Sequence, residues 1–390
     1  CWGDNSYGES GTGSVSPGLV MTSGLGRFFA SASIKNLTGC AVESDGTYAL
    51  SANNLWCWGY NGNYNLANGT TSANATATQI SGLSTKTTTQ VATGVNHVCA
   101  ITSDATNNLW CWGYNIYGGT GAATATNDAT TNSTTTPYNV TGGTLSGLKV
   151  VAVAAGSAHT CAITSDAVTS TTSNVHCWGS NGLGALGTGS VGGITATPAR
   201  AIVSGSSALA GKTAIAIAAG DNHTCVLTSE GSVVCWGYNS SGQVGNNSTT
   251  NTGTPTSVAT SAASPASSLN GKTVVGIAAA GSTSCAVATD GTAHCWGSGT
   301  PYWRADGTTS SSQFPVAVKT FAGDIAAAHT LAGVSDTTSR PAATAISIGQ
   351  DHTVIRTGPQ TPTISSVTNP RTATPTVVVS ALGSSAAGLS

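Results

Sequence analysis

Cysteine and histidine are the residue types in this chain that could support covalent or metal chemistry, with 11 and 7 copies in 390 residues. Ten of the cysteines fall into five pairs, and the second member of each pair begins the tripeptide Cys-Trp-Gly. The pairs are Cys40 and Cys57, Cys99 and Cys111, Cys161 and Cys177, Cys225 and Cys235, and Cys285 and Cys295. Zinc sites usually show Cys-x-x-Cys spacing, whereas each pair here is wider and brackets a turn. The spacing therefore favours disulfides over zinc, and disulfides indicate an oxidising compartment.

The eleventh cysteine, Cys1, begins a sixth Cys-Trp-Gly and has no companion before it. Three hypotheses stay open for it. Its partner could lie upstream in a larger protein, it could bond to another chain, or it could carry lipid at a mature terminus. The absence of an initiator methionine and of a signal peptide favours a processed or truncated start.

Five histidines occupy one equivalent position of a repeated segment and are therefore spread along the chain: His97, His159, His223, His329 and His352. Such a set does not converge on a metal, so we expect each ring to bond the backbone of its own copy. His176 and His294 directly precede second cysteines, and we expect them on strand faces. The histidines thus predict no metal site.

Acidic residues recur where turns are expected: Asp45, Asp104, Asp166, Glu230, Asp290 and Asp336. Turn chemistry explains them, because aspartate side chains bond nearby backbone groups. The chain has no Gly-x-Ser-x-Gly elbow before a helix, no phosphate loop and no recurring carboxylate pair. The sequence therefore predicts neither an enzyme nor a cofactor.

The copy around Cys225 shows best which elements hold the cysteines. An apolar strand is expected over 214–219 and a second over 223–228, followed by a turn at Ser229–Ser232 and a returning strand over 233–237. The two cysteines would face each other across this hairpin. A disulfide that closes a loop of this size contributes about 3 kcal/mol. No 3.6-residue apolar period of useful length occurs, so the chain should be nearly all β.

Composition supports a folded core with unusual surfaces. Charged residues make up 7% of the chain, and the net charge is −2. This balance gives no electrostatic reason to expect nucleic acid or an anionic membrane as a partner. The 39% of hydrophobic residues and the 9 tryptophans argue for a core rather than disorder. No stretch of eighteen apolar residues exists, so no transmembrane segment is predicted.

The repeated text resembles the regulator-of-chromosome-condensation repeat family. The family pattern Trp-Gly-x-Asn-x-x-Gly-x-x-Gly is matched over residues 178–187, and its Ile-Ala-Ala-Gly-x-x-His-Thr segment over residues 217–224. The match covers about residues 1–357 and implies a β-propeller, expected with seven blades or, as the fallback, six. The resemblance also implies that this cysteine-stapled version is the one often carried by secreted bacterial members.

The order of elements suggests how such a ring would close. Residues 1–3 correspond to a returning strand, and the segment 352–355 near the end of the repeats corresponds to an outgoing strand. Pairing the two would remove both sheet edges. Residues 358–390 form a separate Pro/Thr/Ser/Val-rich tail. It is expected to be a linker, the start of a further domain, or a strand that joins a neighbouring subunit.

Two segments break the repeat and are candidate contact sites, with core packing or edge capping as the alternative. One contains Phe28 and Phe29, and the other contains Tyr302, Trp303 and Arg304. Aromatic and arginine residues are favoured in protein contacts. Candidate glycosylation sequons, which a chain this rich in Asn and Thr also produces by chance, begin at Asn36, Asn68, Asn74, Asn132, Asn139 and Asn222.

These observations favour one function over two others. The favoured one is a non-catalytic extracellular structural or adhesion protein, whose partners are other protein subunits of a cell-surface or filamentous assembly. The alternative is a soluble secreted protein-binding module such as an enzyme inhibitor. A nucleotide-exchange factor would work in a reducing compartment and present acidic surfaces, so the paired cysteines and the low charge argue against it.

Overall fold

The computed structural model describes residues 28–35, 38–44, 55–123, 133–169, 172–260, 267–300, 304, 306–318, 343–348, 353–357 and 377–381. These residues form five four-stranded sheets and one three-stranded sheet, with strands numbered β1 to β23. Each four-stranded sheet is antiparallel and uses consecutive strands. We call these sheets blades 1 to 5 and the three-stranded one sheet 6.

The strand bounds show the same spacing from blade to blade. Blade 1 consists of β1 (Phe28–Lys35), β2 (Thr38–Ser44), β3 (Leu55–Gly59) and β4 (Asn74–Gln79). Blade 2 consists of β5 (Thr88–Thr93), β6 (His97–Thr102), β7 (Leu109–Gly113) and β8 (Thr134–Asn139). Blade 3 consists of β9 (Val150–Ala155), β10 (His159–Thr164), β11 (Val175–Ser180) and β12 (Ile194–Arg200).

The remaining strands follow the same order. Blade 4 consists of β13 (Ala214–Ala219), β14 (His223–Thr228), β15 (Val233–Gly237) and β16 (Thr252–Ser257). Blade 5 consists of β17 (Val274–Ala280), β18 (Thr283–Ala288), β19 (Ala293–Gly297) and β20 (Ser312–Ala317). Sheet 6 consists of β21 (Ala343–Ile348), β22 (Thr353–Thr357) and β23 (Val377–Ala381). Two 3-10 helices, η1 (Ser81–Leu83) and η2 (Gly143–Leu145), lie in the links after blades 1 and 2.

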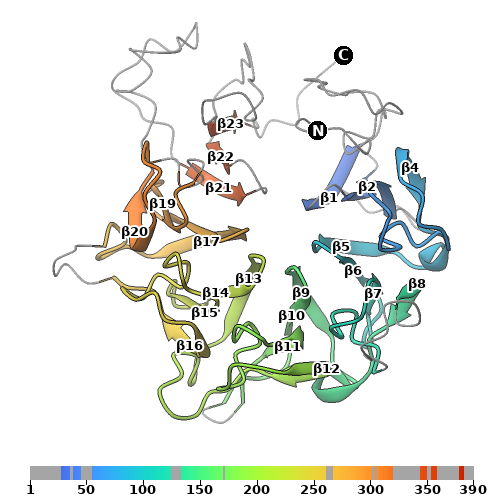
Figure 1. Cartoon of the computed structure of the whole chain (residues 1–390), viewed down its shortest axis with the longest axis horizontal. Coiled ribbons are helices and arrows are strands. Elements are labelled where there is room, and N and C mark those ends of the chain that lie inside the picture. Colours follow the sequence, from blue (N-terminus) through green and yellow to red (C-terminus); the bar gives the residue numbers. More distant parts are fainter. Residues whose placement is uncertain are drawn as a thin grey trace, which may run out of the picture.

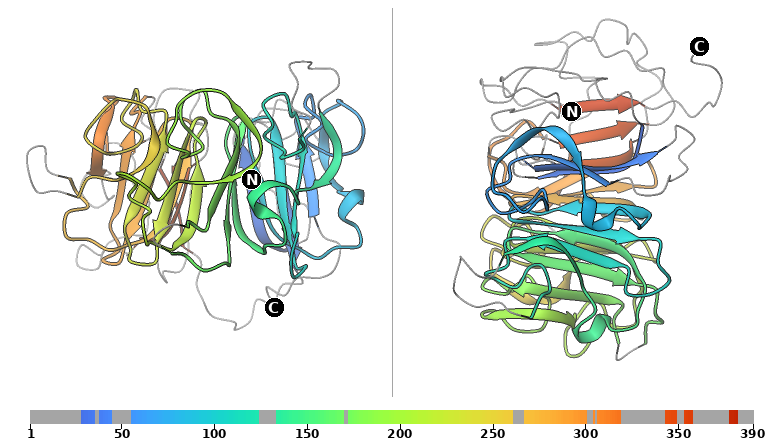
Figure 2. Two further views of the ribbon diagram at one scale, coloured as in Figure 1. Left: turned by 90° about the horizontal axis from the view of Figure 1, so that it is seen from below. Right: turned by 90° about the vertical axis from the view of Figure 1, so that its right-hand side faces the viewer.

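The sheets are arranged around a common centre, as Figure 1 shows. The first strand of each sheet lies innermost, and these strands neighbour one another in the order β1, β5, β9, β13, β17 and β21. The strands run through the thickness of the disc (Figure 2). The predicted all-β propeller is confirmed. A seventh sheet is not found among the described residues, whose six sheets agree with the fallback number.

The end of the ring differs from the predicted closure. Strand β22 pairs with β21 on one edge and with β23 on the other, and the β22–β23 pairing is parallel from Thr353 opposite Val377 to Thr357 opposite Ala381. The edge of β22 assigned to residues 1–3 is therefore occupied, and residues 1–3 lie outside the described residues. A strand from the tail beyond residue 357 thus pairs within its own chain.

The second strands of blades 2 to 5 explain why the repeats contain continuous apolar segments. All six residues of β6, β10, β14 and β18 are buried. Each of these strands lies inside its sheet and between two neighbouring blades, so both of its faces meet other side chains. A strand that is buried on both faces needs a continuous apolar run rather than an alternating one.

Tryptophan joins each blade to the one before it. Trp178 of blade 3 packs in one buried cluster with Cys99 and Cys111 of blade 2. Trp236 packs in the same way with the blade 3 cysteines, and Trp296 with those of blade 4. These indoles are fully buried, and an indole is one of the largest apolar groups available to fill such an interface. The predicted role of the tryptophans between sheets is confirmed.

Candidate functional site: the hairpin face

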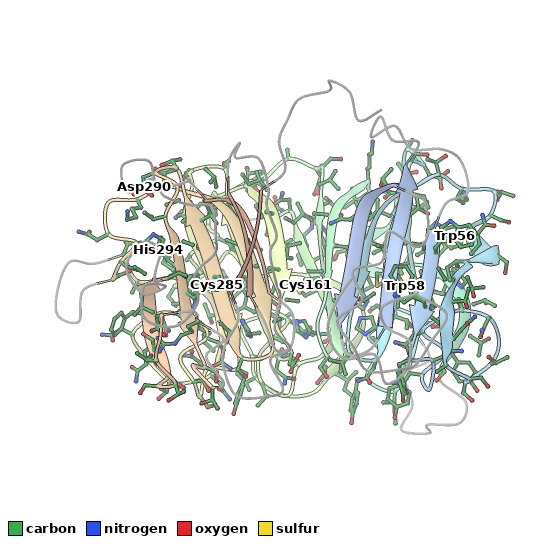
Figure 3. All side chains as sticks on the ribbon, turned by 90° about the horizontal axis from the view of Figure 1, so that it is seen from above. Trp56, Trp58, Cys161, Cys285, Asp290 and His294 are labelled. Atoms are coloured by element: carbon green, nitrogen blue, oxygen red, sulfur yellow. A yellow bond between two sulfur atoms is a disulfide. The ribbon has the colours of Figure 1, made fainter. Side chains whose placement is uncertain are left out.

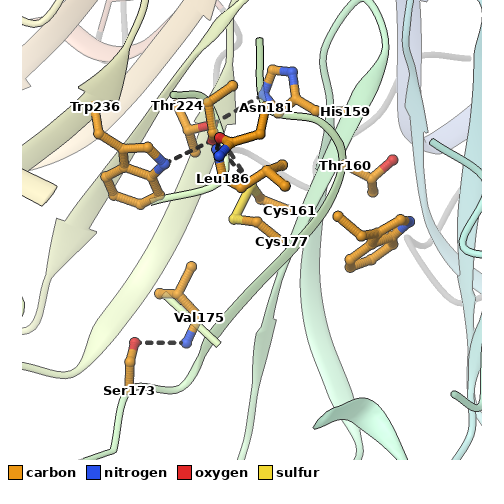
Figure 4. The surroundings of a disulfide bond; sticks show 12 residues. His159, Thr160, Cys161, Ser173, Val175, Cys177, Asn181, Leu186, Thr224 and Trp236 are labelled. Atoms are coloured by element: carbon orange, nitrogen blue, oxygen red, sulfur yellow. Dashed lines mark hydrogen bonds between the residues drawn. A yellow bond between two sulfur atoms is a disulfide. The ribbon is translucent and has the colours of Figure 1, made fainter. Parts of the chain in front are cut away.

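All five predicted cysteine pairs form disulfides in the structure. In every case the two cysteines lie directly opposite each other on the second and third strands of one blade, as Cys161 and Cys177 do. Their side chains are buried, and Trp236 of the next blade lies beside this pair (Figure 4). Cys1 lies outside the described residues. Each disulfide is therefore a staple within a blade and is shielded from solvent.

The repeat-equivalent histidines link neighbouring blades rather than bonding only within their own blade. The Nε2 atom of His97 lies 2.6 Å from the Thr160 hydroxyl, and that of His159 lies 3.0 Å from the Thr224 hydroxyl. His223 makes the same contact with Ser284 at 2.8 Å. Figure 4 shows the link from His159 to Thr224. His329 and His352 lie outside the described residues.

Each of these hydroxyl groups also donates a hydrogen bond to a backbone carbonyl. Thr224 donates to the carbonyl of Ala185 at 3.0 Å, and the Trp236 indole N–H donates to the same oxygen at 2.8 Å. A hydroxyl has one proton, so Thr224 accepts from the histidine Nε2–H. The glycine of the Gly-x-x-His motif is required here, because a Cβ atom on Gly220 would collide with the His223 ring. The motif residues are therefore explained by packing between blades.

His176 and His294 form a different and fully buried arrangement. The Nδ1 atom of His294 lies 2.7 Å from the Ser268 hydroxyl, and its Nε2 atom lies 2.6 Å from the Thr292 hydroxyl. Thr292 in turn donates to a carboxylate oxygen of Asp290 at 2.6 Å. Because a carboxylate can only accept, Thr292 takes its remaining bond from a protonated Nε2 of His294. His176 repeats this pattern in blade 3.

Burial keeps both of these rings neutral. Burial, together with the cation of Arg200 and despite Asp166, lowers the pKa of His176 to about 4. Burial, together with the cation of Lys272 and despite Asp290, lowers the pKa of His294 to about 4. A hydroxyl, an imidazole and a carboxylate in sequence resemble a nucleophile triad. In such a triad the carboxylate bonds the imidazole directly, whereas here the hydroxyl of Thr164 or Thr292 stands between the two, so we interpret the arrangement as a stabilising network of the blade.

The acidic residues of the predicted turns pair with cations at the start of the inner strands. Lys86 Nζ lies 2.8 Å from an Asp104 carboxylate oxygen, and this hydrogen bond holds the pKa of Asp104 below its usual value. Asp290 pairs with Lys272, which lowers its pKa in the same way. Glu230 is 3.9 Å from Lys212. Asp45 and Asp336 lie outside the described residues.

Blade 3 departs from this pairing. Asp166 pairs with Arg200 of the outer strand at 2.6 Å instead of with Lys149, which is exposed. Burial raises the pKa of Asp166, but hydrogen bonds from Thr164 and Arg200 lower it more, so that the net shift is downward. Lys149 consequently stands on the surface beside the inner strand β9 and leaves a cation available there.

These turns and links share one face of the ring, which we call the hairpin face. In each blade the chain enters the inner strand at the same end of the sheet at which the second and third strands are joined. Backbone hydrogen bonds tie the two connections together, for example from Ser229 N–H to the carbonyl of Thr213. Figure 3 places Asp290, a turn residue of this face, at the edge of the disc.

Aliphatic side chains are exposed on the hairpin face around the central opening. Val151, Ile215 and Val275 hold the second position of three neighbouring inner strands, and they are 49%, 55% and 53% exposed. In blades 4 and 5 this residue falls where the register of the inner strand shifts. Bulges of this kind turn a side chain away from its regular direction. We call these three residues the apolar crescent.

A pocket of about 270 Å³ opens on the same face between blades 4 and 5. Its floor is made of the buried aliphatic residues Val233, Val258, Leu269 and Val274. Its rim includes Glu230, Ser232 and Lys272. The pocket and the apolar crescent make the hairpin face a candidate surface for binding another molecule.

Of the predicted contact residues, Arg304 is the one whose side-chain surroundings the structure describes. Arg304 is 2% exposed, lies 3.0 Å from an Asp306 carboxylate oxygen and donates to the Thr308 hydroxyl at 2.7 Å. It therefore holds its own loop instead of facing a partner, which corrects its predicted role as a contact. Tyr302 and Trp303 lie outside the described residues. Phe28 and Phe29 lie in β1, opposite Ser44 and Glu43.

The sequons differ in how their amide groups are engaged. Asn68 is exposed, and its carbonyl accepts from the Thr70 N–H and hydroxyl. Asn139 donates its amide to the carbonyls of Asn107 and Leu109, so the nitrogen that a glycan would need is already bonded. Asn74 donates to Thr78, and Asn222 is half-buried. Asn36 and Asn132 lie outside the described residues.

Sequence reasoning missed three sets of residues that the structure brings together. The buried amides of Asn108 and Asn174 bridge to the next blade, the hydroxyls of Thr144 and Ser268 bond the strand-face histidines, and the crescent is exposed. The signal for the hydroxyls was present. Thr144 and Ser268 stand before equivalent leucines, and Ala208 stands there in the copy that has Val234 instead of histidine.

Neither a metal-binding cluster nor a membrane-spanning helix is found among the described residues. Among the described residues, no group of three or more His, Cys, Asp or Glu side chains is placed to hold a metal ion. Over the same residues, no helix is long and apolar enough to span a bilayer.

Comparison with known proteins supports the repeat. The profile described as "Regulator of chromosome condensation (RCC1) repeat" matches residues 53–101, 107–163, 173–227 and 230–287, which is more than half of the chain. Human HERC4, a probable E3 ubiquitin-protein ligase, is 29% identical over 59% of this chain and 19% of its own length. The human E3 ubiquitin-protein ligase HERC2 is 28% identical over 77% of this chain and 6% of its own. The chain thus spans a fifth or less of these relatives.

Solved structures agree on the fold. Human WBSCR16 superposes with a TM-score of 0.65 at 17% identity, covering 85% of this chain and 74% of that protein. Yeast RCC1 (Prp20), solved bound to Kap60, superposes with a TM-score of 0.64 at 19% identity, covering 89% of this chain and 73% of that chain. At these identities the likeness establishes the architecture alone.

Proposed function

This chain belongs to the regulator of chromosome condensation (RCC1) repeat family, and on that premise we propose that it is a non-catalytic propeller that binds other proteins outside the cytoplasm. More specifically, we propose a structural or adhesion role as a subunit of a cell-surface or filamentous assembly. The fold alone does not give a function, so the proposal depends on features of this chain.

The observation that carries the proposal is the set of five buried disulfides, one in each complete blade. Disulfides persist in oxidising compartments and are rare where glutathione and thioredoxin keep thiols reduced. A blade that relies on such a staple would lose stability in a reducing compartment. This supports a location at the cell surface or beyond it.

A protein partner is supported by the hairpin face and by a relative. The three residues of the apolar crescent are each about half exposed and lie on neighbouring inner strands, and exposed apolar residues that share one face are typical of contact sites. Yeast Prp20p was solved in a study of its binding to Gsp1p and histones, and that propeller therefore uses its surface to bind proteins. No histone or exchange role is carried over, since the sequence similarity is low.

Assembly into filaments is supported by β23. This strand comes from the tail, outside the repeat, and it adds to the edge of sheet 6. A strand that is not part of a blade could add equally to the same edge of a second copy, which is a known route to strand-linked subunits. Candidate glycans at the exposed Asn68 would help such a surface of low charge to stay soluble.

Two measurements test the proposal. Thiol titration of the denatured, unreduced protein should find at most one free thiol, and finding most cysteines free would overturn the oxidising location. Electron microscopy of native material should show fibres with a subunit repeat, and a chain that ends at residue 357 should lose them. The same fibres from the shortened chain would exclude strand exchange through β23.

The alternative is a soluble secreted protein-binding module such as an enzyme inhibitor. The specific observation in its favour is the pocket between blades 4 and 5, because a partner's side chain could anchor there without any assembly. Dispersed single rings in the micrographs, together with oxidised cysteines, would favour this alternative.

A further inference from the structure

The interfaces between blades 2 and 3 and between blades 3 and 4 are clamped by a buried amide. The Nδ2 atom of Asn108 donates to the carbonyl of Val150 at 2.9 Å, and its Oδ1 atom accepts from Val150 N–H at 2.8 Å. Asn174 makes the same two bonds with Ala214, at 2.8 and 3.1 Å. The asparagine side chain thus forms the two hydrogen bonds that the backbone of a neighbouring strand would form, and it fills the space beside the next inner strand.

The interface between blades 4 and 5 lacks this clamp. The equivalent residue is Ser232, whose hydroxyl bonds Thr228 in its own turn. Val274 N–H instead donates to the backbone carbonyl of Gly231 at 2.9 Å. No side chain from the turn fills the space that asparagine fills elsewhere, and the 270 Å³ pocket lies there. Blade 5 has Thr292 at the equivalent position, so the turns of blades 4 and 5 both lack the asparagine, and in blade 4 this absence is accompanied by the pocket.

The size of the pocket limits what can occupy it. Sites for whole small-molecule ligands usually exceed about 300 Å³, so a volume of about 270 Å³ suits a single side chain or a fragment of that size. Its floor consists of buried aliphatic groups from both blades. An apolar occupant would displace water from these groups, and such burial is favourable in proportion to the apolar area.

The charges at the rim determine what should flank that side chain. Lys272 is already bonded to Asp290 and to the Thr292 hydroxyl at 3.2 Å. Glu230, whose side chain is 61% exposed, has a loose contact of 3.9 Å with Lys212. The accessible charge at the rim is consequently a carboxylate. A cationic residue beside the occupant would complement it.

The pocket lining is continuous along the chain with one residue of the apolar crescent. Val274 lines the pocket, and the next residue of β17, Val275, belongs to the crescent, with Ile215 on the neighbouring inner strand. A partner segment that enters the pocket would therefore also cover exposed aliphatic groups near the central opening. This continuity favours a protein segment over a free small molecule.

We infer that the pocket between blades 4 and 5 is an anchor site for a partner protein, which inserts one aliphatic side chain and places a lysine or arginine next to it against Glu230. The inference rests on the proposed protein-binding function and adds the chemistry of the partner. Binding pockets of this kind concentrate the affinity of an interface in a few side chains.

The test uses the full chain with labelled valine and leucine methyl groups and three probe peptides. These are acetyl-Lys-Leu-Lys-amide, acetyl-Lys-Ser-Lys-amide and acetyl-Glu-Leu-Glu-amide. We expect the first peptide to shift the methyl signals of Val233, Val258, Leu269 and Val274. The serine peptide should bind more weakly because it lacks the apolar side chain, and the glutamate peptide should bind up to about fivefold more weakly because it cannot form the exposed ion pair with Glu230. Equal shifts with all three peptides, or shifts from the first peptide elsewhere on the ring, would overturn the inference.

Two variants and one control separate the pocket from general surface effects. Ser232→Asn introduces the amide that blades 2 and 3 carry at this position and should abolish the shifts. The control Ser229→Asn places the same amide at an exposed turn residue outside the pocket lining and should leave them unchanged. Glu230→Gln should weaken the lysine peptide about fivefold. Undisturbed methyl signals of Leu109 and Val150 in blades 2 and 3 verify folding. Unchanged binding in Ser232→Asn would refute the anchor site, and with all ten paired cysteines still oxidised the proposed function would remain.

Discussion

The two buried histidines predict a specific dependence of stability on pH, and blade 4 supplies the matched variant. Blade 4 has Val234 at the position of His176 and His294, and Ala208 where the histidine blades have Thr144 or Ser268. Introducing these two residues into blades 3 and 5 removes each imidazole together with its hydroxyl partner. The variant carries the four substitutions Thr144→Ala, His176→Val, Ser268→Ala and His294→Val.

The magnitude follows from the shift of each pKa. The folded value is about 4 for both rings, against 6.5 in the unfolded chain. As pH falls below 6.5, the unfolded chain binds protons that the folded chain does not, so stability is full above 6.5 and decreases toward pH 4. At pH 5 the loss is about 2 kcal/mol for each histidine, and about 4 kcal/mol for both.

Carboxylates do not obscure this window. The pKa values of Asp166 and Asp290 lie below their ordinary value of 3.8. Their contribution is present above about pH 4 and is lost only under more acidic conditions. Three further buried histidines, His97, His159 and His223, are present in both the natural chain and the variant. The difference between the two proteins over pH 6.5 to 4 therefore reports His176 and His294 alone.

The assay is guanidinium unfolding of the oxidised protein at pH 7 and pH 5. Between the two conditions the natural chain should lose about 4 kcal/mol more than the four-residue variant, because the buried valines of the variant do not titrate. The two-residue variants of blade 3 or blade 5 alone should each fall about halfway. An equal loss in the natural chain and the four-residue variant would refute the assignment of neutral, buried rings.

Three further predictions concern stability. Replacing Cys225 and Cys235 together by serine should cost about 2–3 kcal/mol in guanidinium unfolding, and reductant should then have a smaller effect than on the natural chain. Gly187→Ala should cost more than Gly211→Ala in the same assay. Both have φ near +67°, but only at Gly187 does the new Cβ meet a neighbour, the next blade's indole, at 2.9 Å. Asn174→Ala should cost about 2 kcal/mol and speed amide exchange at Ala214, whereas unchanged exchange would contradict the clamp.

The repeat made much of the fold predictable. Three patterns predicted the hairpins, their disulfides and the propeller architecture: cysteine pairs that bracket turns, apolar segments that end in glycine, and Trp-Gly segments. The structure shows all of these features. They are predictable because each depends on local chain geometry or on a period that neighbouring copies reinforce. The number of sheets was less predictable, since the repeat becomes irregular after blade 5.

Contacts between blades could not be derived from one copy. Arg304 is of a residue type that is favoured in protein contacts, but in the structure its guanidinium group is buried and pairs with the Asp306 carboxylate. No sequence pattern singled out Asn108, whose amide bridges to Val150 of the next blade. That partner is set by where the turn lies in three dimensions, and no spacing in the sequence encodes that position.

The disulfides stabilise single blades, and noncovalent contacts hold neighbouring blades together. Every disulfide among the described residues lies within one blade, so oxidation stabilises single hairpins and does not lock one blade to the next. The contacts between blades are noncovalent: the tryptophan, the histidine relay and the asparagine clamp. Natural proteins break their local rules mostly where function requires it. The interface between blades 4 and 5 has Ser232 in place of the asparagine and contains the pocket, and the proposed anchor site accounts for this departure.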